Sequence, residues 1–158
     1  MRLWILRHAR AELDSDSGRD RDRRLDAAGL RCCRRLNQVL ASTSAAWPPE
    51  RILVSPATRT RETAALVLNG MPVSEPELSS SLWMADLSTL IDLISAEASS
   101  GLMLVGHNPG LEELVKYLGG ELPITGLKPG TLVLLEFDRP VSPGRAKTLQ
   151  LVEANEST

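Results

Sequence analysis

Short apolar runs alternate along the chain with segments of helical periodicity. Uninterrupted apolar runs predict buried strands at residues 2–6, 51–54 and 102–105. Residues 72–74 are compatible with one more short strand. Residues 131–137 and 146–152, separated by a turn rich in proline and glycine, predict an antiparallel pair.

Four segments carry apolar residues three or four positions apart, as on the buried face of a helix. They lie at about 27–41, at 57–68, after Asp86 or Ser88, and at 111–118. Asp26 fits the N-cap of the first helix, and Asn69-Gly70 and Gly119-Gly120 fit the ends of the second and the fourth. Strands that alternate with helices in this way predict an α/β fold of three layers, α/β/α, with a mostly parallel central sheet and antiparallel C-terminal strands. We expect residues 1–158 to form a single domain.

Two segments between these elements are polar or rich in small residues. Residues 42–49 are expected to be a linker. Residues 12–24 form a loop dense in Asp, Ser, Gly and Arg. Loops of this length are often functional or disordered. Two interpretations therefore stay open, a mobile surface loop and a lid or phosphate-contacting loop.

Composition excludes several classes of partner. The chain has 158 residues, of which 42% are hydrophobic, and a net charge of −2, so no global field attracts nucleic acid or an anionic membrane. No apolar run approaches the ~18 residues of a membrane span, and no signal peptide is recognisable. We expect a cytoplasmic monomer without nucleic-acid or membrane partners. The adjacent Cys32 and Cys33 fit neither a disulfide framework nor a zinc site; we expect one on a buried helix face and the other as a bystander.

The two histidines of the chain, His8 and His107, each follow an apolar run. Both are therefore expected at the C-terminal ends of parallel strands, where open α/β sheets bind ligands. Residues 55–60 follow another strand and meet the same edge at a helix N-terminus, which favours anions. Together with Arg7 and Arg59, this arrangement predicts a phosphate pocket. The alternatives are a pair of structural histidines and, less well supported because a third ligand is lacking, a metal site.

The motifs resemble those of a known family. Arg7-His8-Ala9 resembles the Arg-His-Gly signature of the histidine phosphatase superfamily, which has the phosphoglycerate mutase-like fold. Ser55-Pro56 with Arg59-Thr60, and Gly106-His107-Asn108, resemble its second and third motifs in the same order. Ala9 replaces the usual glycine, which is compatible with a negative φ at this position.

Within the superfamily the chain resembles the short SixA type, which dephosphorylates phosphohistidine on signalling proteins. The pattern Asp20, Arg23, Leu25 and the segment 109–112 (Pro-Gly-Leu-Glu) are similar to that branch. The chain also lacks the large insertion that mutases and sugar phosphatases carry between the second and third motifs.

The resemblance implies roles for individual residues. His8 is implied to be the nucleophile that forms a phosphohistidine intermediate, and Arg7 and Arg59 to bind the phosphoryl oxygens. His107 is implied to donate a hydrogen bond to the phosphoryl group, with Arg23 and the Asn108 backbone as further contacts. No metal ion or cofactor is expected, because arginine supplies the positive charge.

The leaving group separates the candidate substrates. A phosphate ester leaves as an alkoxide and needs a general acid, whereas imidazole is a much better leaving group. Glu75, Glu77 and Asp86 are the candidates for such an acid, and none matches the family pattern. This favours a phosphohistidine protein as partner over a small phosphate ester. A small-molecule phosphatase or mutase, and a phosphate-binding module without activity, remain the alternatives.

Overall fold

The computed structural model describes residues 1–42 and 47–154. Its strands are β1 (Arg2–Arg7), β2 (Arg51–Val54), β3 (Glu77–Leu78), β4 (Gly101–Gly106), β5 (Thr131–Glu136) and β6 (Lys147–Glu153). Its α-helices are α1 (Ala27–Ala41), α2 (Thr58–Val67), α3 (Leu87–Ser95) and α4 (Gly110–Leu118). Part of the expected linker, residues 43–46, lies outside the described residues.

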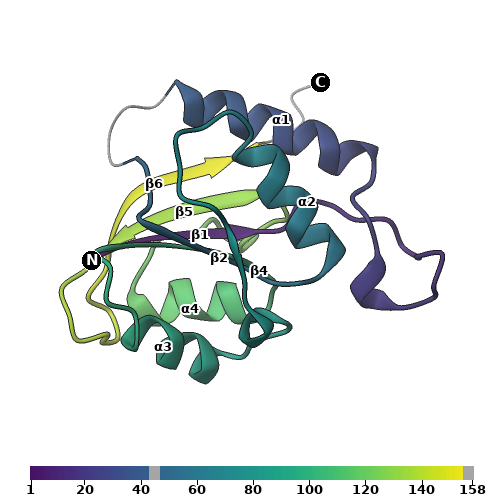
Figure 1. Cartoon of the computed structure of the whole chain (residues 1–158). Coiled ribbons are helices and arrows are strands. Elements are labelled where there is room, and N and C mark those ends of the chain that lie inside the picture. Colours follow the sequence, from purple (N-terminus) through teal and green to yellow (C-terminus); the bar gives the residue numbers. More distant parts are fainter. Residues whose placement is uncertain (43–46, 155–158) are drawn as a thin grey trace.

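The strands form one sheet in the order β3-β2-β4-β1-β5-β6. β1 and β2 both pair in parallel with β4, and β3 pairs in parallel with β2. β5 and β6 are antiparallel to their neighbours. Helices α1 and α2 cover one face of the sheet and α3 and α4 cover the other (Figure 1). The expected three-layer fold with antiparallel C-terminal strands is therefore confirmed.

Alternate side chains of each strand enter two separate cores. Trp4 and Leu6 of β1 face helices α1 and α2, whereas Leu3 and Ile5 face α3 and α4. These four side chains are at most 3% exposed. A buried leucine or isoleucine stabilises the fold by roughly 1.5–3 kcal/mol. Burial on both faces explains why the central strands are continuous apolar runs in the sequence.

The helix ends follow the expected capping residues. The Asp26 carboxylate accepts a hydrogen bond from the Gly29 backbone at 2.8 Å, and the Asp86 carboxylate accepts one from Thr89 at 2.9 Å. Gly119 ends α4 with a φ of +89°, in the left-handed region that glycine adopts without strain.

Two predictions at the level of elements were wrong. The short strand is β3 at Glu77–Leu78 and not residues 72–74, because strand pairing with β2 begins only where Leu53 meets Glu77. The Arg51 guanidinium reinforces this register with two hydrogen bonds to the Glu77 carboxylate. The two cysteines are both buried, so neither is a bystander.

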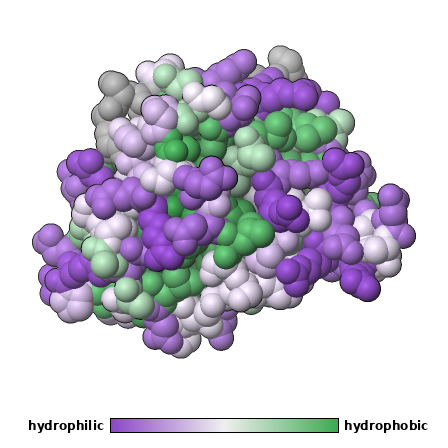
Figure 2. All heavy atoms as spheres, viewed as in Figure 1, coloured by the Kyte–Doolittle hydropathy of each residue, from purple (hydrophilic) through white to green (hydrophobic). Residues whose placement is uncertain are grey.

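The surface seen from the side of β3 and α2 mixes apolar and charged groups. Figure 2 shows hydrophobic side chains in the middle of this face, surrounded by hydrophilic ones. A groove of about 690 Å³ runs along α2 and includes Arg24, Thr58, Arg61, Glu75 and Leu78 among its lining residues. Within the described part of the chain, no helix is long and apolar enough to cross a membrane.

Candidate active site

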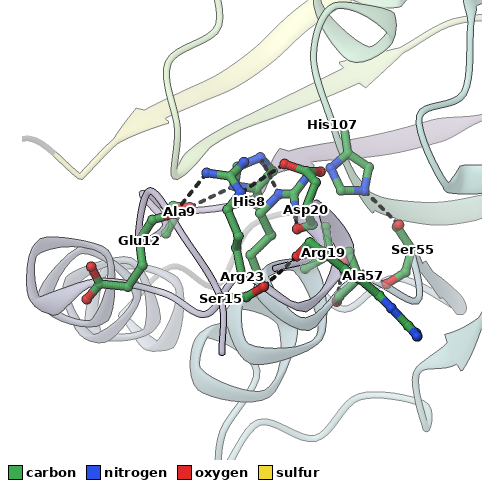
Figure 3. Close-up of polar contacts among 12 residues, drawn as sticks. His8, Ala9, Glu12, Ser15, Arg19, Asp20, Arg23, Ser55, Ala57 and His107 are labelled. Atoms are coloured by element: carbon green, nitrogen blue, oxygen red, sulfur yellow. Dashed lines mark hydrogen bonds and ion pairs between the residues drawn. The ribbon is translucent and has the colours of Figure 1, made fainter. Parts of the chain in front are cut away.

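Three strands bring the predicted motifs together at one edge of the sheet. Arg7 pairs with Gly106 and Val54 with Val105, so the segments that follow these residues start side by side. The His8 backbone donates to the Gly106 carbonyl at 3.1 Å, and the Ser55 backbone donates to the Val105 carbonyl at 3.0 Å. His8, Ser55 and His107 therefore share this edge, as the sequence predicted (Figure 3).

His8 is held with one ring nitrogen on the backbone and the other beside an arginine. Nδ1 donates to the Ala9 carbonyl at 2.7 Å, which fixes the proton on this nitrogen. Nε2 then carries the lone pair and accepts from Arg59 Nε at 3.3 Å. Burial, reinforced by the positive charge of Arg59, lowers the pKa of His8 to about 4. His8 is therefore neutral at neutral pH, with its lone pair on Nε2.

In His107 the ring nitrogen hydrogen-bonded within the protein is Nε2, whereas in His8 the backbone carbonyl binds Nδ1. Its Nε2 lies 2.7 Å from the Ser55 hydroxyl, and its ring centre lies 5.4 Å from that of His8. The Trp83 ring packs edge-on against His107 with centroids 5.3 Å apart. Burial, followed by the proximity of His8, lowers the pKa of His107 to about 3.

The tautomer of His107 depends on the direction of its hydrogen bond with Ser55. Nδ1 is buried and has no hydrogen-bond partner among the described residues. If the Ser55 hydroxyl donates to Nε2, the proton of the neutral ring resides on Nδ1. A buried N–H without an acceptor costs about 1–3 kcal/mol, so a ligand oxygen at this position is favoured.

Arg59 connects His8 to the polar loop that the sequence placed at residues 12–24. The Arg59 side chain is 3% exposed, although it carries a full charge. Its terminal nitrogens donate to the Asp20 carbonyl at 2.9 Å and to the Asp20 carboxylate at 3.1 Å. The same carboxylate accepts from Arg23 Nε at 2.9 Å (Figure 3). Asp20 therefore bridges the guanidiniums of Arg59 and Arg23.

The charge state of Asp20 follows from this bridge. Desolvation acts to raise the pKa of Asp20, but the charges and hydrogen bonds of Arg59 and Arg23 together hold it below its usual value. Asp20 is therefore a carboxylate and not an acid at neutral pH.

Arg7 and Asn108 meet on a shared backbone carbonyl. The Leu127 carbonyl accepts from the Arg7 guanidinium at 2.8 Å and from the Asn108 side-chain amide at 2.9 Å. The Glu112 carboxylate accepts from the Leu127 backbone at 3.0 Å and so fixes this loop from helix α4. Arg7 Nε is buried without a hydrogen-bond partner among the described residues, which leaves a second donor for a ligand.

Side chains of helix α2 form hydrogen bonds to the backbone on both sides of the polar loop that follows His8. The Thr63 hydroxyl accepts from the Ala9 backbone at 3.1 Å and donates to the Arg59 carbonyl at 2.7 Å. The Glu62 carboxylate accepts from the Leu25 backbone at 2.8 Å. The loop is therefore tied to the site at both ends, which favours the interpretation as a phosphate-contacting loop over a free surface loop.

The three carboxylates that the sequence offered as a general acid lie in different parts of the structure. Glu77 is paired with Arg51, Asp86 caps helix α3, and Glu75 lines the groove along α2. Neither histidine is hydrogen-bonded to a carboxylate in the described ranges. None of the three carboxylates is thus joined to His8.

Two residues of the site have no functional signature that sequence reasoning found. Asp20 is noticeable in the sequence only as a member of the pattern Asp20, Arg23, Leu25. Its contact with Arg59 spans 39 positions and so cannot be read from the sequence. Trp83 packs against His107, and its ring lies 5.6 Å from the Arg59 guanidinium. Ala9 does not have a positive φ, since Met84 is the one non-glycine residue in the described ranges that does. Alanine therefore replaces the usual glycine without backbone strain.

The arrangement of possible metal ligands is a further feature of the described residues. Among residues 1–42 and 47–154, no three His, Cys, Asp or Glu side chains are grouped so that they could hold a metal ion. The charges that act on His8 are the guanidiniums of Arg59, Arg7 and Arg23.

Comparison with known proteins assigns the chain to a family. The sequence model of the histidine phosphatase superfamily (branch 1) matches residues 3–82. An uncharacterized chloroplastic protein of Arabidopsis thaliana is 34% identical over 131 residues, covering 75% of this chain and 59% of that protein. The chain thus spans about three-fifths of the length of this relative.

Solved structures are similar over almost the whole chain. A candidate phosphohistidine phosphatase SixA from Agrobacterium tumefaciens has a TM-score of 0.82 and 27% identity, with 96% of both chains covered. The protein histidine phosphatase SixA complexed with tungstate has a TM-score of 0.77 and 24% identity, with coverage of 98% and 97%. A candidate alpha-ribazole-5'-P phosphatase from Escherichia coli, with a TM-score of 0.67 and 17% identity over 100% of both chains, shares the fold alone. The chain therefore belongs to the histidine phosphatase superfamily, branch 1, and has the fold of its SixA-type members.

Proposed function

We propose that this protein is a phosphohistidine phosphatase that acts through a covalent phosphohistidine intermediate on His8. The observation that carries the proposal is the state of His8. Its ring is neutral, Nδ1 is bound to the Ala9 carbonyl, and Nε2 faces the guanidinium of Arg59. A neutral imidazole nitrogen beside a fixed positive charge is suited to attack on a phosphoryl group.

The donors around Nε2 form a cradle for the phosphoryl oxygens. Arg59 Nε already points at Nε2, and Arg7 Nε and His107 Nδ1 are buried without partners in the described chain. Three donors bound to one oxyanionic group would supply the stabilisation that phosphoryl transfer needs. Because guanidiniums supply the positive charge, we propose that no metal ion takes part. Arg23 and the Asn108 backbone are proposed as further substrate contacts.

The reaction then has two steps. His8 Nε2 forms a bond to phosphorus while the bond from phosphorus to the substrate nitrogen breaks. The substrate ring, which carries a proton on its distal nitrogen, takes the electron pair of the broken bond and leaves as neutral imidazole. Water next attacks the phosphoryl group on His8 and releases phosphate and the neutral His8 ring. The Ala9 carbonyl keeps the proton on Nδ1 throughout.

The surroundings of His8 support a nitrogen leaving group. An alkoxide needs a proton from a general acid, and Glu75, Glu77 and Asp86 all have other positions. Imidazole accepts its electron pair at far lower cost, since its conjugate acid has a pKa of about 6.5. The similarity to SixA-type structures supports a phosphohistidine-bearing signalling protein as partner.

Steady-state hydrolysis of a donor panel tests this proposal. We expect the wild-type protein to hydrolyse a phosphohistidine-bearing protein and phosphoramidate faster than sugar phosphates, with EDTA present. His8→Ala should abolish turnover of every donor. Faster hydrolysis of sugar phosphates than of phosphohistidine would instead make the protein a small-molecule phosphatase of the same fold.

A further inference from the structure

Asp20 is a carboxylate at the cradle that the two-step reaction above does not use. Its side chain is 56% exposed, whereas the Arg59 side chain that it binds is 3% exposed. It therefore borders solvent on one side and the buried phosphate cradle on the other.

The contacts of Arg59 define where Asp20 lies relative to the nucleophile. Arg59 binds His8 through Nε and Asp20 through both terminal nitrogens. A phosphoryl group that lies along this guanidinium has the attacking nitrogen at the Nε end and Asp20 at the opposite end. In an in-line displacement the leaving group departs on the side away from the attacking nitrogen.

Phosphoryl transfer between two imidazoles is symmetric, so the attacking and the leaving ring both need a proton on the nitrogen that does not bond to phosphorus. The attacking ring keeps a proton on Nδ1, and the Ala9 carbonyl accepts it at 2.7 Å. The leaving ring must carry a proton on its distal nitrogen to depart as neutral imidazole, and this N–H needs an acceptor too. An exposed carboxylate at the far end of Arg59 is such an acceptor.

We propose that the Asp20 carboxylate accepts a hydrogen bond from the distal N–H of the substrate's phosphoimidazole and so selects nitrogen over oxygen leaving groups. This inference rests on the proposed phosphohistidine phosphatase activity and deepens it. His8 Nε2 bonds to phosphorus, the P–N bond breaks, and its electron pair enters the leaving ring. That ring retains its distal proton and leaves neutral, while the phosphorylated His8 ring retains the proton on Nδ1.

The charges that face Asp20 are compatible with this role. Arg59 of α2 and Arg23 of the loop bind it and keep it ionised, and its negative charge acts on His107 at the end of β4. An ionised carboxylate attracts a protonated imidazole ring and repels a developing alkoxide. It also has no proton to give to an ester oxygen.

Asp20→Asn tests the assignment with two donors that differ in the leaving group. We measure kcat/KM for a phosphohistidine peptide and for p-nitrophenyl phosphate, whose leaving group needs no proton. The amide retains an oxygen acceptor for Arg59 but loses the charge, so the ratio of the two kcat/KM values should fall by about tenfold or more. Asp20→Glu, which keeps the charge, should restore part of the ratio.

Asp22→Asn is the matched control. Asp22 lies in the same short 3-10 helix (Asp20–Asp22) and its carboxylate accepts from the Ser17 hydroxyl at 2.6 Å. Removal of this charge should leave the donor ratio unchanged. An equal loss on both donors in Asp20→Asn would show that Asp20 acts only by positioning Arg59 and would overturn the proposal, as would no loss on either. A wild-type protein that fails to hydrolyse phosphohistidine would instead refute the proposed function itself.

Discussion

At the scale of the residue, the two histidines differ in which nitrogen the protein occupies. The Ala9 carbonyl binds Nδ1 of His8 and leaves Nε2 as a base, whereas Ser55 contacts Nε2 of His107 and leaves Nδ1 without a partner among the described residues. Burial keeps both rings neutral. Two identical side chains at equivalent strand ends thus use opposite ring nitrogens to contact the protein, and we propose opposite roles for them toward a phosphoryl group.

Titration of the ring protons by NMR checks the charge state. We expect pKa values of about 4 for His8 and about 3 for His107 in the ligand-free protein, both below the ordinary 6.5. Trp83→Ala removes an aromatic ring that covers His107, so the pKa of His107 should rise toward 6.5. Trp47→Ala, which removes a ring packed on Trp4, should not change it.

The same shifts make stability depend on pH. An unfolded histidine binds its proton near pH 6.5, whereas His8 and His107 bind theirs only near pH 4 and pH 3. The unfolded state therefore binds more protons between these values, and the free energy of unfolding should fall as pH drops from 6.5 to about 4. A double variant, His8→Asn with His107→Asn, should show a flatter profile in this window. An unchanged profile would contradict the buried, neutral state of both rings.

At the scale of the element, the sequence pattern predicted the strands and helix caps, because these depend on residues close together in the chain. The apolar runs of β1, β2 and β4 and the caps at Asp26 and Asp86 are encoded within a few residues, so they were found. The contact between Asp20 and Arg59 depends on how the loop before α1 lies against α2. The local pattern of apolar and polar residues contains no information about such a contact. The same holds for the packing of Trp83 on His107, which joins two residues far apart in the sequence.

The short strand illustrates the same limit. Residues 72–74 and 77–78 are equally compatible with a two- or three-residue strand by composition. The pairing of Leu53 with Glu77 and the ion pair between Arg51 and Glu77 decide between them. Both are long-range interactions that become visible only in the folded chain.

Gly130, just before β5, provides a test at this scale. Its backbone N–H donates to the Arg7 and His8 carbonyls at 3.1 and 3.0 Å, with a φ of +75°. A Cβ there would lie 2.3 Å from Cys32 Sγ. Gly130→Ala should therefore lower the free energy of unfolding in urea by about 2–4 kcal/mol, the sum of overpacking and left-handed backbone strain.

Gly18→Ala separates the two contributions. Gly18 has a φ of +74°, and a Cβ added there would have nothing within 4 Å, so this variant should show the backbone cost of about 1–2 kcal/mol alone. Cys32→Ala in the Gly130→Ala background should recover part of the loss. Equal destabilisation by Gly130→Ala and Gly18→Ala would rule out the contact with Cys32 as a cause.

At the scale of the whole molecule, the sheet brings the residues of the candidate site together from distant segments. The parallel strands β1, β2 and β4 end at a common edge, and each contributes the residue that follows it: His8, Ser55 and His107. Helix α2 adds Arg59, and the loop before α1 adds Asp20 and Arg23. Two cores, one on each face of the sheet, keep these ends in register.

Detection of the phosphorylated enzyme tests the central claim most directly. The protein is mixed with phosphoramidate or a phosphohistidine protein, quenched in alkali, and mapped by mass spectrometry. We expect one phosphoryl group on His8 that survives base and is lost in acid, and none on the His8→Ala variant. A phosphoryl group on any other residue, or full turnover by His8→Ala, would contradict the assignment of His8 as the nucleophile.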